Sequence, residues 1–167
     1  DLLDVARAES GAVQMDLRPV DVAGVVEDVR RSVGLRKEAQ GLTLTAERDG
    51  DDLVALADSV RLSQVIGNLV TNAVKYGASG GTVTLRTGRV GRRIRVEVID
   101  RGPGLSAEKQ SQLFEPFNRL GLERSAIEGH GIGLTLAKRL TELQNGEIGV
   151  ISAPGEGAIF WIELPAG

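Results

Sequence analysis

Apolar residues recur along this chain with two different spacings, which predict a mixed order of helices and strands. From Asp21 to Gly41, valines lie three or four positions apart, the period of an amphipathic helix, with Asp21 as its cap. Residues 42–46 and 53–57 alternate between apolar and polar positions, as short strands do. We therefore expect one helix and two strands in the first third of the chain.

The middle of the chain predicts a longer helix and then a β-hairpin. The helix begins after Asp58, which is a capping residue type. Residues 81–100 alternate as two strands, and residues 88–91 are expected to form the turn between them. The predicted buried positions of the helix and of the hairpin are Leu62, Val65, Ile66, Leu69, Val70, Ala73, Val83, Leu85, Ile94, Val96 and Val98.

The two ends of the chain add further elements. Residues 1–10 have a helical pattern that ends at Gly11, and residues 17–20 form an extended link. A short helix capped by Ser106 is followed by a polar, aperiodic stretch, and then by a helix that ends at Leu143. The last two strands are predicted over residues 147–152 and 158–164.

Composition narrows the class of protein. The chain has 167 residues, enough for one domain with a sizeable core, and its net charge of −3 gives no general attraction to nucleic acid or to an anionic membrane. It has no cysteine, which excludes disulfides and cysteine–zinc sites, and it has neither an apolar run of transmembrane length nor a signal peptide. Because the first residue is Asp1 and the only methionine is Met15, we expect a piece of a longer protein.

The long helix carries three polar residues on one face. Asn68, Asn72 and Lys75 are spaced by four and then three positions, so they lie side by side. Asparagine is unfavourable inside a helix because its amide competes for backbone hydrogen bonds. Either this face is simply solvated, or the amides supply oxygen ligands for a hard cation beside a lysine that binds phosphate.

Two glycine-rich stretches are also candidates for chemistry. Asp100 ends a strand and is followed by glycines on both sides of a proline, so its carboxylate could accept a hydrogen bond from an exocyclic amine such as that of adenine. Residues 129–134 alternate glycine with other residues just before a helix, which is an arrangement that binds phosphate. The alternatives are an ordinary turn and a flexible loop. The five arginines between positions 86 and 95 indicate a solvated sheet face or, less strongly, a docking site for an acidic partner.

These residues together resemble a known family. In chain order, four motifs are similar to the N, G1, F and G2 boxes of the sensor histidine kinase ATP-binding domain, which shares a superfamily with the gyrase, Hsp90 and MutL ATPases. The motifs are Asn68-x-x-x-Asn72-Ala-x-Lys75-Tyr76, Asp100-x-Gly102-x-Gly104, Phe114-x-x-Phe117 and Gly129-x-Gly131-x-Gly133-Leu134. The Walker A pattern and the motifs of Ser/Thr protein kinases are absent.

The resemblance implies a fold and a domain organisation. It implies a two-layer α/β sandwich of the Bergerat type, with a mixed sheet of about five strands and helices on one face. Residues 1–18 would be the end of a dimerisation helix and a linker, and residues 19–167 the catalytic ATP-binding domain. Two positions depart from the family: Gly77 stands where Ser or Thr is common, and Ala158 where a Thr or Ser contacts adenine indirectly.

The resemblance also implies how ATP and Mg²⁺ are bound. Asn72 and Asn68 would stand at the metal, and Lys75 beside the phosphates. Asp100 would bind the adenine amino group, and Arg119 would reach the γ-phosphate, so that Asn68, Lys75 and Arg119 form the catalytic set. The other implied nucleotide-binding residues are Tyr76, Gly102, Gly104, Leu105, Phe117, Gly129, His130, Gly131, Ile132, Gly133 and Leu134.

One position separates a kinase from an ATPase. The ATPases of the superfamily carry a glutamate where this chain has Asn68, and that glutamate is the general base for water. An amide cannot take a proton, so water activation should be poor. The phosphoacceptor of the family is a histidine on the dimerisation helix. We expect it upstream of Asp1, since His130 lies inside the glycine stretch.

The function implied is that of a sensor histidine kinase catalytic domain in two-component signalling. Its partners would be its own dimerisation domain, in a homodimer, and the receiver domain of a response regulator, with no nucleic acid and no membrane contact by this domain. We expect a cytoplasmic location. The alternatives are a Ser/Thr protein kinase of the same superfamily and a non-catalytic nucleotide-binding module that works by docking.

Overall fold

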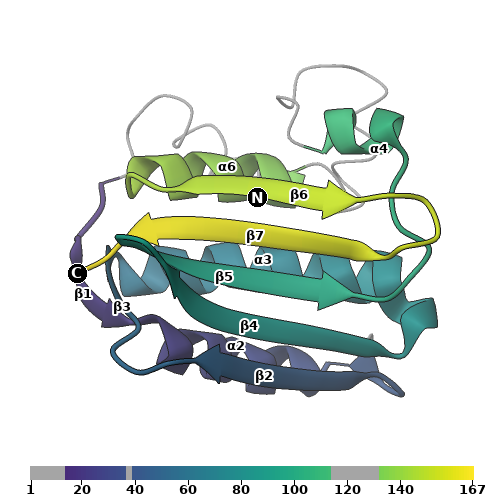
Figure 1. The fold of residues 1–167 in the computed structure, drawn as a ribbon, viewed down its shortest axis with the longest axis horizontal. Coiled ribbons are helices and arrows are strands. Elements are labelled where there is room, and N and C mark those ends of the chain that lie inside the picture. Colours follow the sequence, from purple (N-terminus) through teal and green to yellow (C-terminus); the bar gives the residue numbers. More distant parts are fainter. Residues whose placement is uncertain (1–13, 37–38, 114–131) are drawn as a thin grey trace.

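The computed structural model describes residues 14–36, 39–113 and 132–167 and has two layers, a β-sheet and a set of helices (Figure 1). The predicted helix over residues 1–10 lies outside the described residues. The main sheet has five strands in the order β2-β4-β5-β7-β6. Their bounds are Thr43–Asp49 for β2, Thr82–Val90 for β4, Arg93–Asp100 for β5, Ala158–Pro165 for β7 and Glu147–Ser152 for β6.

The pairing in this sheet is mixed. β2 runs parallel to β4, and the other neighbours are antiparallel. The parallel pair requires a long crossover, which α3 and the short 3₁₀ helix η2 (Ala78–Gly80) supply together with β3. The mixed sheet of about five strands that the resemblance implied is therefore confirmed.

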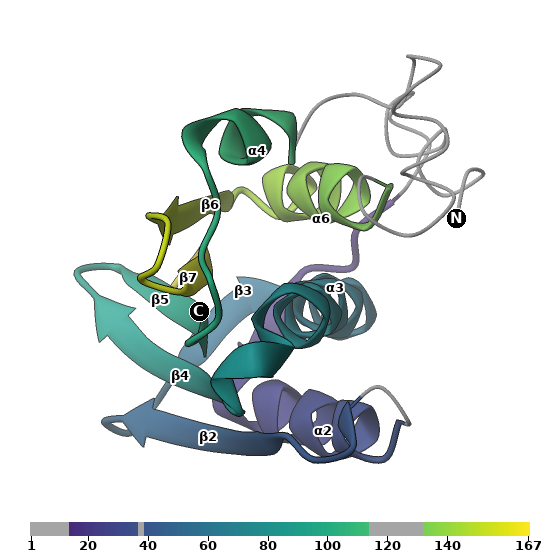
Figure 2. The same ribbon diagram turned by 90° about the vertical axis from the view of Figure 1, so that its right-hand side faces the viewer.

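Three helices cover one face of the sheet (Figure 2). They are α2 (Val22–Gly34), α3 (Ser59–Gly77) and α6 (Ile132–Leu143), and the short α4 (Ala107–Gln112) follows β5 in the chain. The apolar stripe predicted for α3 is buried throughout, with each of its six members at most 1% exposed, and so are the predicted inward positions of the hairpin. The core lies between the sheet and these helices, as the helical and alternating patterns predict.

Three predictions for the first part of the chain differ from the structure. The first helix, α2, ends at Gly34 rather than Gly41, because the valine pattern stops at Val33 and the next residue, Leu35, is 85% exposed. Asp21 occupies its N-cap position but makes no side-chain capping hydrogen bond. The extended link predicted over residues 17–20 is in fact a strand, β1 (Arg18–Asp21), which pairs antiparallel with β3 (Val54–Ala57).

The hairpin turn also lies later than predicted. β4 continues through Gly88, which is paired with Arg95, and ends at Val90, paired with Arg93. The two residues between the strands are Gly91 and Arg92, and Gly91 has a φ of +62°. A tight two-residue turn requires such a positive φ, which glycine adopts at no steric cost, so the turn forms there.

Two arginines of the hairpin, Arg86 and Arg95, pair with carboxylates on the other face of the sheet. Arg95 pairs with Glu163 at 2.7 Å and Glu97 at 3.2 Å, and its guanidinium lies 4.5 Å from the centre of the Trp161 ring. Arg86 lies 3.6 Å from Glu47 on the neighbouring strand. This charge balance favours a solvated sheet face over a docking site for an acidic partner.

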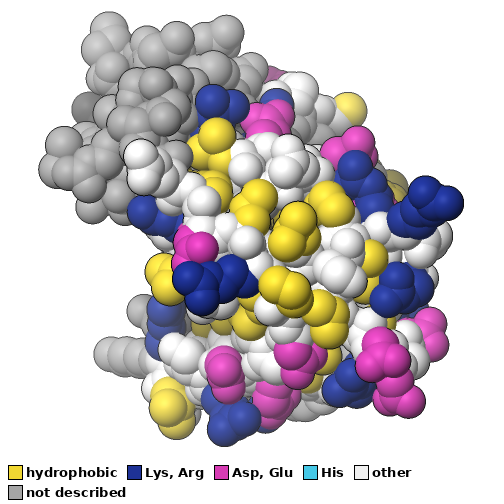
Figure 3. Space-filling view, turned by 90° about the vertical axis from the view of Figure 1, so that its left-hand side faces the viewer, with side chains coloured by type: hydrophobic (Ala, Val, Ile, Leu, Met, Phe, Trp, Pro, Cys, Tyr) yellow, Lys and Arg dark blue, Asp and Glu magenta, His cyan; other side chains and the backbone are white. Residues whose placement is uncertain are grey.

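The end of the molecule that carries β1, β3 and the C-terminus has an apolar centre surrounded by charged side chains (Figure 3). Leu56 in β3 and Val60 at the start of α3 are 36% and 72% exposed. The chain enters the domain beside them, because residue 14 lies with Val60 along a cleft of about 650 Å³.

Candidate functional site

The buried face of α3 positions the two asparagines. Asn72 is only 4% exposed, and its Nδ2 donates to the main-chain oxygen of Asn68 at 2.9 Å. That bond leaves the Asn72 amide oxygen as the group that can meet a cation. Asn68 is half-buried and borders a groove of about 440 Å³ between α2 and α3, and Lys75 is exposed in the last turn. The two amides therefore differ, one enclosed and the other beside an open groove.

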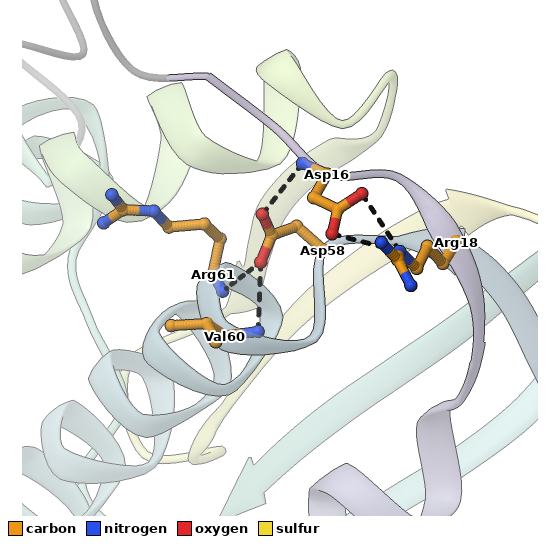
Figure 4. A network of polar contacts seen from close by, with 5 residues as sticks. All are labelled: Asp16, Arg18, Asp58, Val60 and Arg61. Atoms are coloured by element: carbon orange, nitrogen blue, oxygen red, sulfur yellow. Dashed lines mark hydrogen bonds and ion pairs between the residues drawn. The ribbon is translucent and has the colours of Figure 1, made fainter.

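Asp58 holds the start of α3 in place (Figure 4). Its Oδ1 accepts from the main-chain N–H groups of Val60 at 3.0 Å and Arg61 at 3.1 Å, which confirms the predicted cap. Its Oδ2 accepts from the N–H of Asp16 at 3.0 Å, in the segment before β1. Burial raises the pKa of Asp58, but the three N–H donors outweigh it and lower the pKa below its usual value.

Replacing Asp58 by Ala should lower the melting temperature. Loss of a capping side chain costs about 0.5–2 kcal/mol, or several degrees in a domain of this size. Because the folded pKa is lowered, the stabilisation is present above the ordinary pKa of aspartate and lost as the pH falls through the folded value. The gap between wild type and variant, measured by thermal unfolding, should close in acid.

Asp21→Ala is the matched control, since Asp21 stands at an N-cap without a capping bond. It should change the melting temperature much less. Equal losses in the two variants would show that the Asp58 hydrogen bonds do not stabilise α3.

The end of α6 is tied to the start of α3. Gln144, 1% exposed, accepts from the N–H of Asp58 at 2.9 Å through its Oε1 and donates to the Leu140 carbonyl at 3.0 Å through its Nε2. The helix that follows the glycine-rich stretch and the helix that carries the asparagines are thus joined by a buried amide.

Asp100 is enclosed at the end of β5. It is 3% exposed, its Oδ1 accepts from the Gly102 N–H at 3.0 Å, and its Oδ2 is buried without a hydrogen-bond partner among the described residues. Burial raises the pKa of this carboxyl, against the opposing effect of the Gly102 and Ala158 N–H groups. A buried oxygen without a donor is costly, so this atom is suited to accept from a ligand.

The turn after Asp100 is held from two sides. Leu105, 3% exposed, donates its N–H to the Ser152 hydroxyl at 2.8 Å, and that hydroxyl donates to the Gly157 carbonyl at 2.6 Å. Gln110 in α4 donates to the carbonyls of Leu105 and Ser152, both at 2.9 Å. Sequence reasoning missed Ser152, Gln110 and Gln144, because their partners lie outside any local motif.

The remaining site residues are placed in part. Ile132, Gly133 and Leu134 form the first turn of α6, where Leu134 is fully buried, and Tyr76 lies in the last turn of α3. Gly102 is buried and Gly104, with a φ of +76°, is half-buried. Phe117, Arg119, Gly129, His130 and Gly131 lie outside the described residues.

Asp100 and the asparagines are brought together through α3. The end of α3 touches Asp100, since a Cβ added to Gly77 would lie 2.4 Å from the Asp100 Cβ. Asn72 is five positions earlier on the same helix, about 7.5 Å along its axis. A carboxylate acceptor therefore lies at one end of the helix, and the amides lie towards its middle.

Sequence comparison places this geometry in a family. Residues 57–167 match the family described as histidine kinase-, DNA gyrase B-, and HSP90-like ATPase. The chain is 34% identical over 166 residues to the alginate biosynthesis sensor protein KinB of Pseudomonas aeruginosa, and 35% identical over 166 residues to the adaptive-response sensory kinase SasA of Thermosynechococcus vestitus. These alignments cover 99% of this chain but only 27% and 43% of the relatives, so the chain spans less than half of their lengths.

A solved structure agrees with the sequence comparison. Full-length ShkA in complex with AMPPNP superposes with a TM-score of 0.84 at 31% identity, covering 99% of this chain and 34% of that one. The helices that the structure describes are all too short or too polar to span a bilayer. The chain therefore belongs to the family of histidine kinase-, gyrase B- and HSP90-like ATPases, as an ATP-binding catalytic domain of the sensor histidine kinase kind.

Proposed function

We propose that this domain transfers the γ-phosphoryl group of ATP to a histidine on a dimerisation domain of the same protein, for relay to an aspartate of a response regulator. The observation that carries the proposal is the buried Oδ2 of Asp100, which has no hydrogen-bond partner in the described part of the chain and which lies against the end of the helix that bears Asn68 and Asn72. Adenine presents an amino donor, and its triphosphate needs cation and lysine partners further along. Asn72 and Lys75, on the same helix, would supply these partners.

In this proposal the nucleotide lies along α3. The adenine amino group donates to Asp100, and the phosphates lie beside Asn72 and Lys75. The first turn of α6 contributes its N–H groups and the positive end of its dipole, which favour phosphate. Leu134, which is buried within that turn, anchors the helix start in the core.

Magnesium fits this donor set. Among residues 14–36, 39–113 and 132–167, no group of three or more His, Asp or Glu side chains comes together as a metal site. Mg²⁺ is commonly held by one or two protein ligands together with substrate phosphates and waters. We propose that the Asn72 amide oxygen, with Asn68 nearby, would hold the ion, which neutralises charge on the phosphates when bound.

Transfer to another group is favoured over hydrolysis because Asn68 cannot act as a base. A water molecule in the site would have no carboxylate at that position to take its proton. Phosphoryl transfer depends mainly on positioning and charge stabilisation, which Lys75 and Arg119 would provide. The acceptor would be a histidine outside this chain, and the domain would act in a homodimer on the cytoplasmic side of the cell.

Calorimetry and self-labelling with this chain test the proposal. The chain should bind Mg-ATP and Mg-ADP and should bind Mg-GTP at least about tenfold more weakly, since guanine presents a carbonyl to Asp100. Incubation with radiolabelled ATP should give negligible label on the chain itself. Equal affinity for ATP and GTP would contradict the adenine assignment, and strong acid-labile self-labelling would contradict an external acceptor.

A further inference from the structure

Gly77, the last residue of α3, packs directly on the side chain of Asp100. A Cβ added at Gly77 would lie 2.4 Å from the Asp100 Cβ, 2.5 Å from its Cγ and 2.7 Å from its Oδ1. Real Cβ atoms do not approach other atoms this closely. Gly77 is not among the glycines with positive φ in the described part of the chain, so its backbone would accept alanine without strain. The three atoms nearest to such a Cβ all belong to the Asp100 side chain, so Asp100 is what excludes an alanine at this position.

The backbone of Asp100 cannot move away from such a side chain. Asp100 is paired with Val83 on one side and Ala158 on the other, inside the five-stranded sheet. Its carbonyl oxygen is also close to Gly157, where an added Cβ would lie 2.3 Å away. Rotating the Asp100 side chain would move its Cγ and Oδ1 but not its Cβ, and it would break the bond from the Gly102 N–H to Oδ1. A side chain at Gly77 would therefore also force the end of α3 away from β5 and disturb the position of the carboxylate.

A second glycine, Gly80, lies equally close to Arg101, the residue after Asp100. A Cβ on Gly80, in η2, would lie 2.4 Å from the carbonyl carbon of Arg101. By contrast, Gly67 in the middle of α3 has open space where its Cβ would stand. The two glycines of α3, Gly67 and Gly77, therefore differ in their surroundings.

We infer that Gly77 is a positioning residue for nucleotide recognition: the absence of a side chain there allows Asp100 to keep its Oδ2 turned to an amino-bearing purine. The inference rests on the proposed binding of adenine by Asp100. The inference adds that the preference for a purine with a 6-amino group depends on Gly77, a residue that has no side chain with which to contact the base. The Ser or Thr common in the family at this position would not fit the Asp100 geometry of this chain.

Binding of ATP and of inosine triphosphate to Gly77→Ala tests this inference. Inosine carries a carbonyl where adenine carries the amino group, so the wild-type protein should prefer ATP about tenfold or more. In Gly77→Ala, ATP affinity should fall about tenfold and inosine triphosphate affinity much less, so the preference is lost. Gly67→Ala, the matched control, should keep the wild-type preference.

The possible outcomes distinguish a failure of the inference about Gly77 from a failure of the adenine assignment. A Gly77→Ala variant that keeps the wild-type preference would overturn the positioning by Gly77 and leave the adenine assignment standing. A wild-type protein that does not distinguish the two nucleotides would overturn the adenine assignment, and the inference with it.

A thermal measurement keeps the test informative if Gly77→Ala folds poorly. Asp100→Gly removes the side chain with which the new Cβ collides. Gly77→Ala should therefore lower the melting temperature by several degrees in the wild-type background and by much less in the Asp100→Gly background. An equal loss in both backgrounds would mean that the collision with Asp100 is not the cause, and it would overturn the inference.

Discussion

Asp100→Asn is expected to weaken ATP binding about tenfold or more while raising the melting temperature of the nucleotide-free protein. The substitution places an amide donor where Oδ2 now lies, buried and without a partner among residues 14–36, 39–113 and 132–167, and where we propose that the adenine amino group, also a donor, binds. A buried donor without an acceptor costs on the order of 1–3 kcal/mol, and about 1.4 kcal/mol is a tenfold change in affinity. Without nucleotide, the same substitution removes a buried negative charge, which costs more than a buried neutral amide.

The stability gain has a definite pH dependence. Burial raises the pKa of Asp100, so at neutral pH the folded protein holds a charge that the unfolded chain carries at lower cost. Stability of the wild-type protein is therefore reduced above the folded pKa and recovers as the pH falls through that value towards the ordinary pKa of aspartate. The melting-temperature advantage of Asp100→Asn should be largest near neutral pH and should shrink in acid.

Calorimetric titration and thermal unfolding check the two halves of this prediction. Glu97→Gln is a matched control, because Glu97 lies on the same strand but forms an ion pair with Arg95 on the other face of the sheet. It should leave ATP affinity unchanged. Unaltered ATP binding by Asp100→Asn would mean that this carboxylate does not contact adenine.

The second large effect is expected where the two asparagines are separated by mutation. Asn72→Ala removes the enclosed amide that we assign to the metal, so nucleotide binding should lose much of its magnesium dependence. Transfer to a supplied dimerisation domain should fall to background. Titrations with and without Mg²⁺, paired with a transfer assay, measure both. Magnesium dependence that survives Asn72→Ala would place the ion on other ligands.

Asn68→Glu should have a different result. It introduces a carboxylate one helical turn before Asn72, beside the groove between α2 and α3. A general base contributes about 100-fold or more to a proton-transfer step, so slow ATP hydrolysis should rise while transfer to histidine does not. Hydrolysis must be measured at saturating nucleotide, because the added negative charge near the phosphates weakens ATP binding.

Asn68→Gln is the control for this change, since it lengthens the side chain but keeps an amide that cannot act as a base. Its hydrolysis rate should stay at the wild-type value. If Asn68→Glu also shows no increase at saturation, a missing base is not what limits water attack, and the distinction between kinase and ATPase loses its main support.

Local sequence patterns were sufficient for most of the fold. The apolar stripe of α3 and the alternation of the hairpin follow directly from periodicity, because a two-layer domain must bury one face of each element. The limits of α2 and of the hairpin turn were misplaced at glycines. Gly41 and Gly88 both suggested a break, yet one follows the helix at a distance and the other lies inside a strand. Gly41 has a positive φ of +84°, but it lies in the turn just before β2 and not at the end of α2, so a positive φ marks a turn without saying which element ends there.

The residues of the candidate site also fall into two groups, those that a local sequence motif predicts and those that it does not. Asn68, Asn72 and Asp100 could be named from residue type and spacing, since each belongs to a local motif. The residues that hold them in place could not be named in this way, because their hydrogen bonds join distant parts of the chain. Gln144 bonds to Asp58, 86 positions away, and Ser152 to Leu105, 47 positions away. The contact between Gly77 and Asp100 likewise depends on how a helix end meets a strand end, which no local pattern specifies.

The most direct test of the proposed phosphotransfer is a labelling experiment with two proteins. This chain and a separately prepared dimerisation domain from the full-length protein are incubated with Mg²⁺ and ATP labelled on its γ-phosphate. We predict label on the dimerisation domain that is stable in base and lost in acid, as phosphohistidine is, and only when this chain is present. Acid-stable label, or release of free phosphate with no label on the dimerisation domain, would contradict the account.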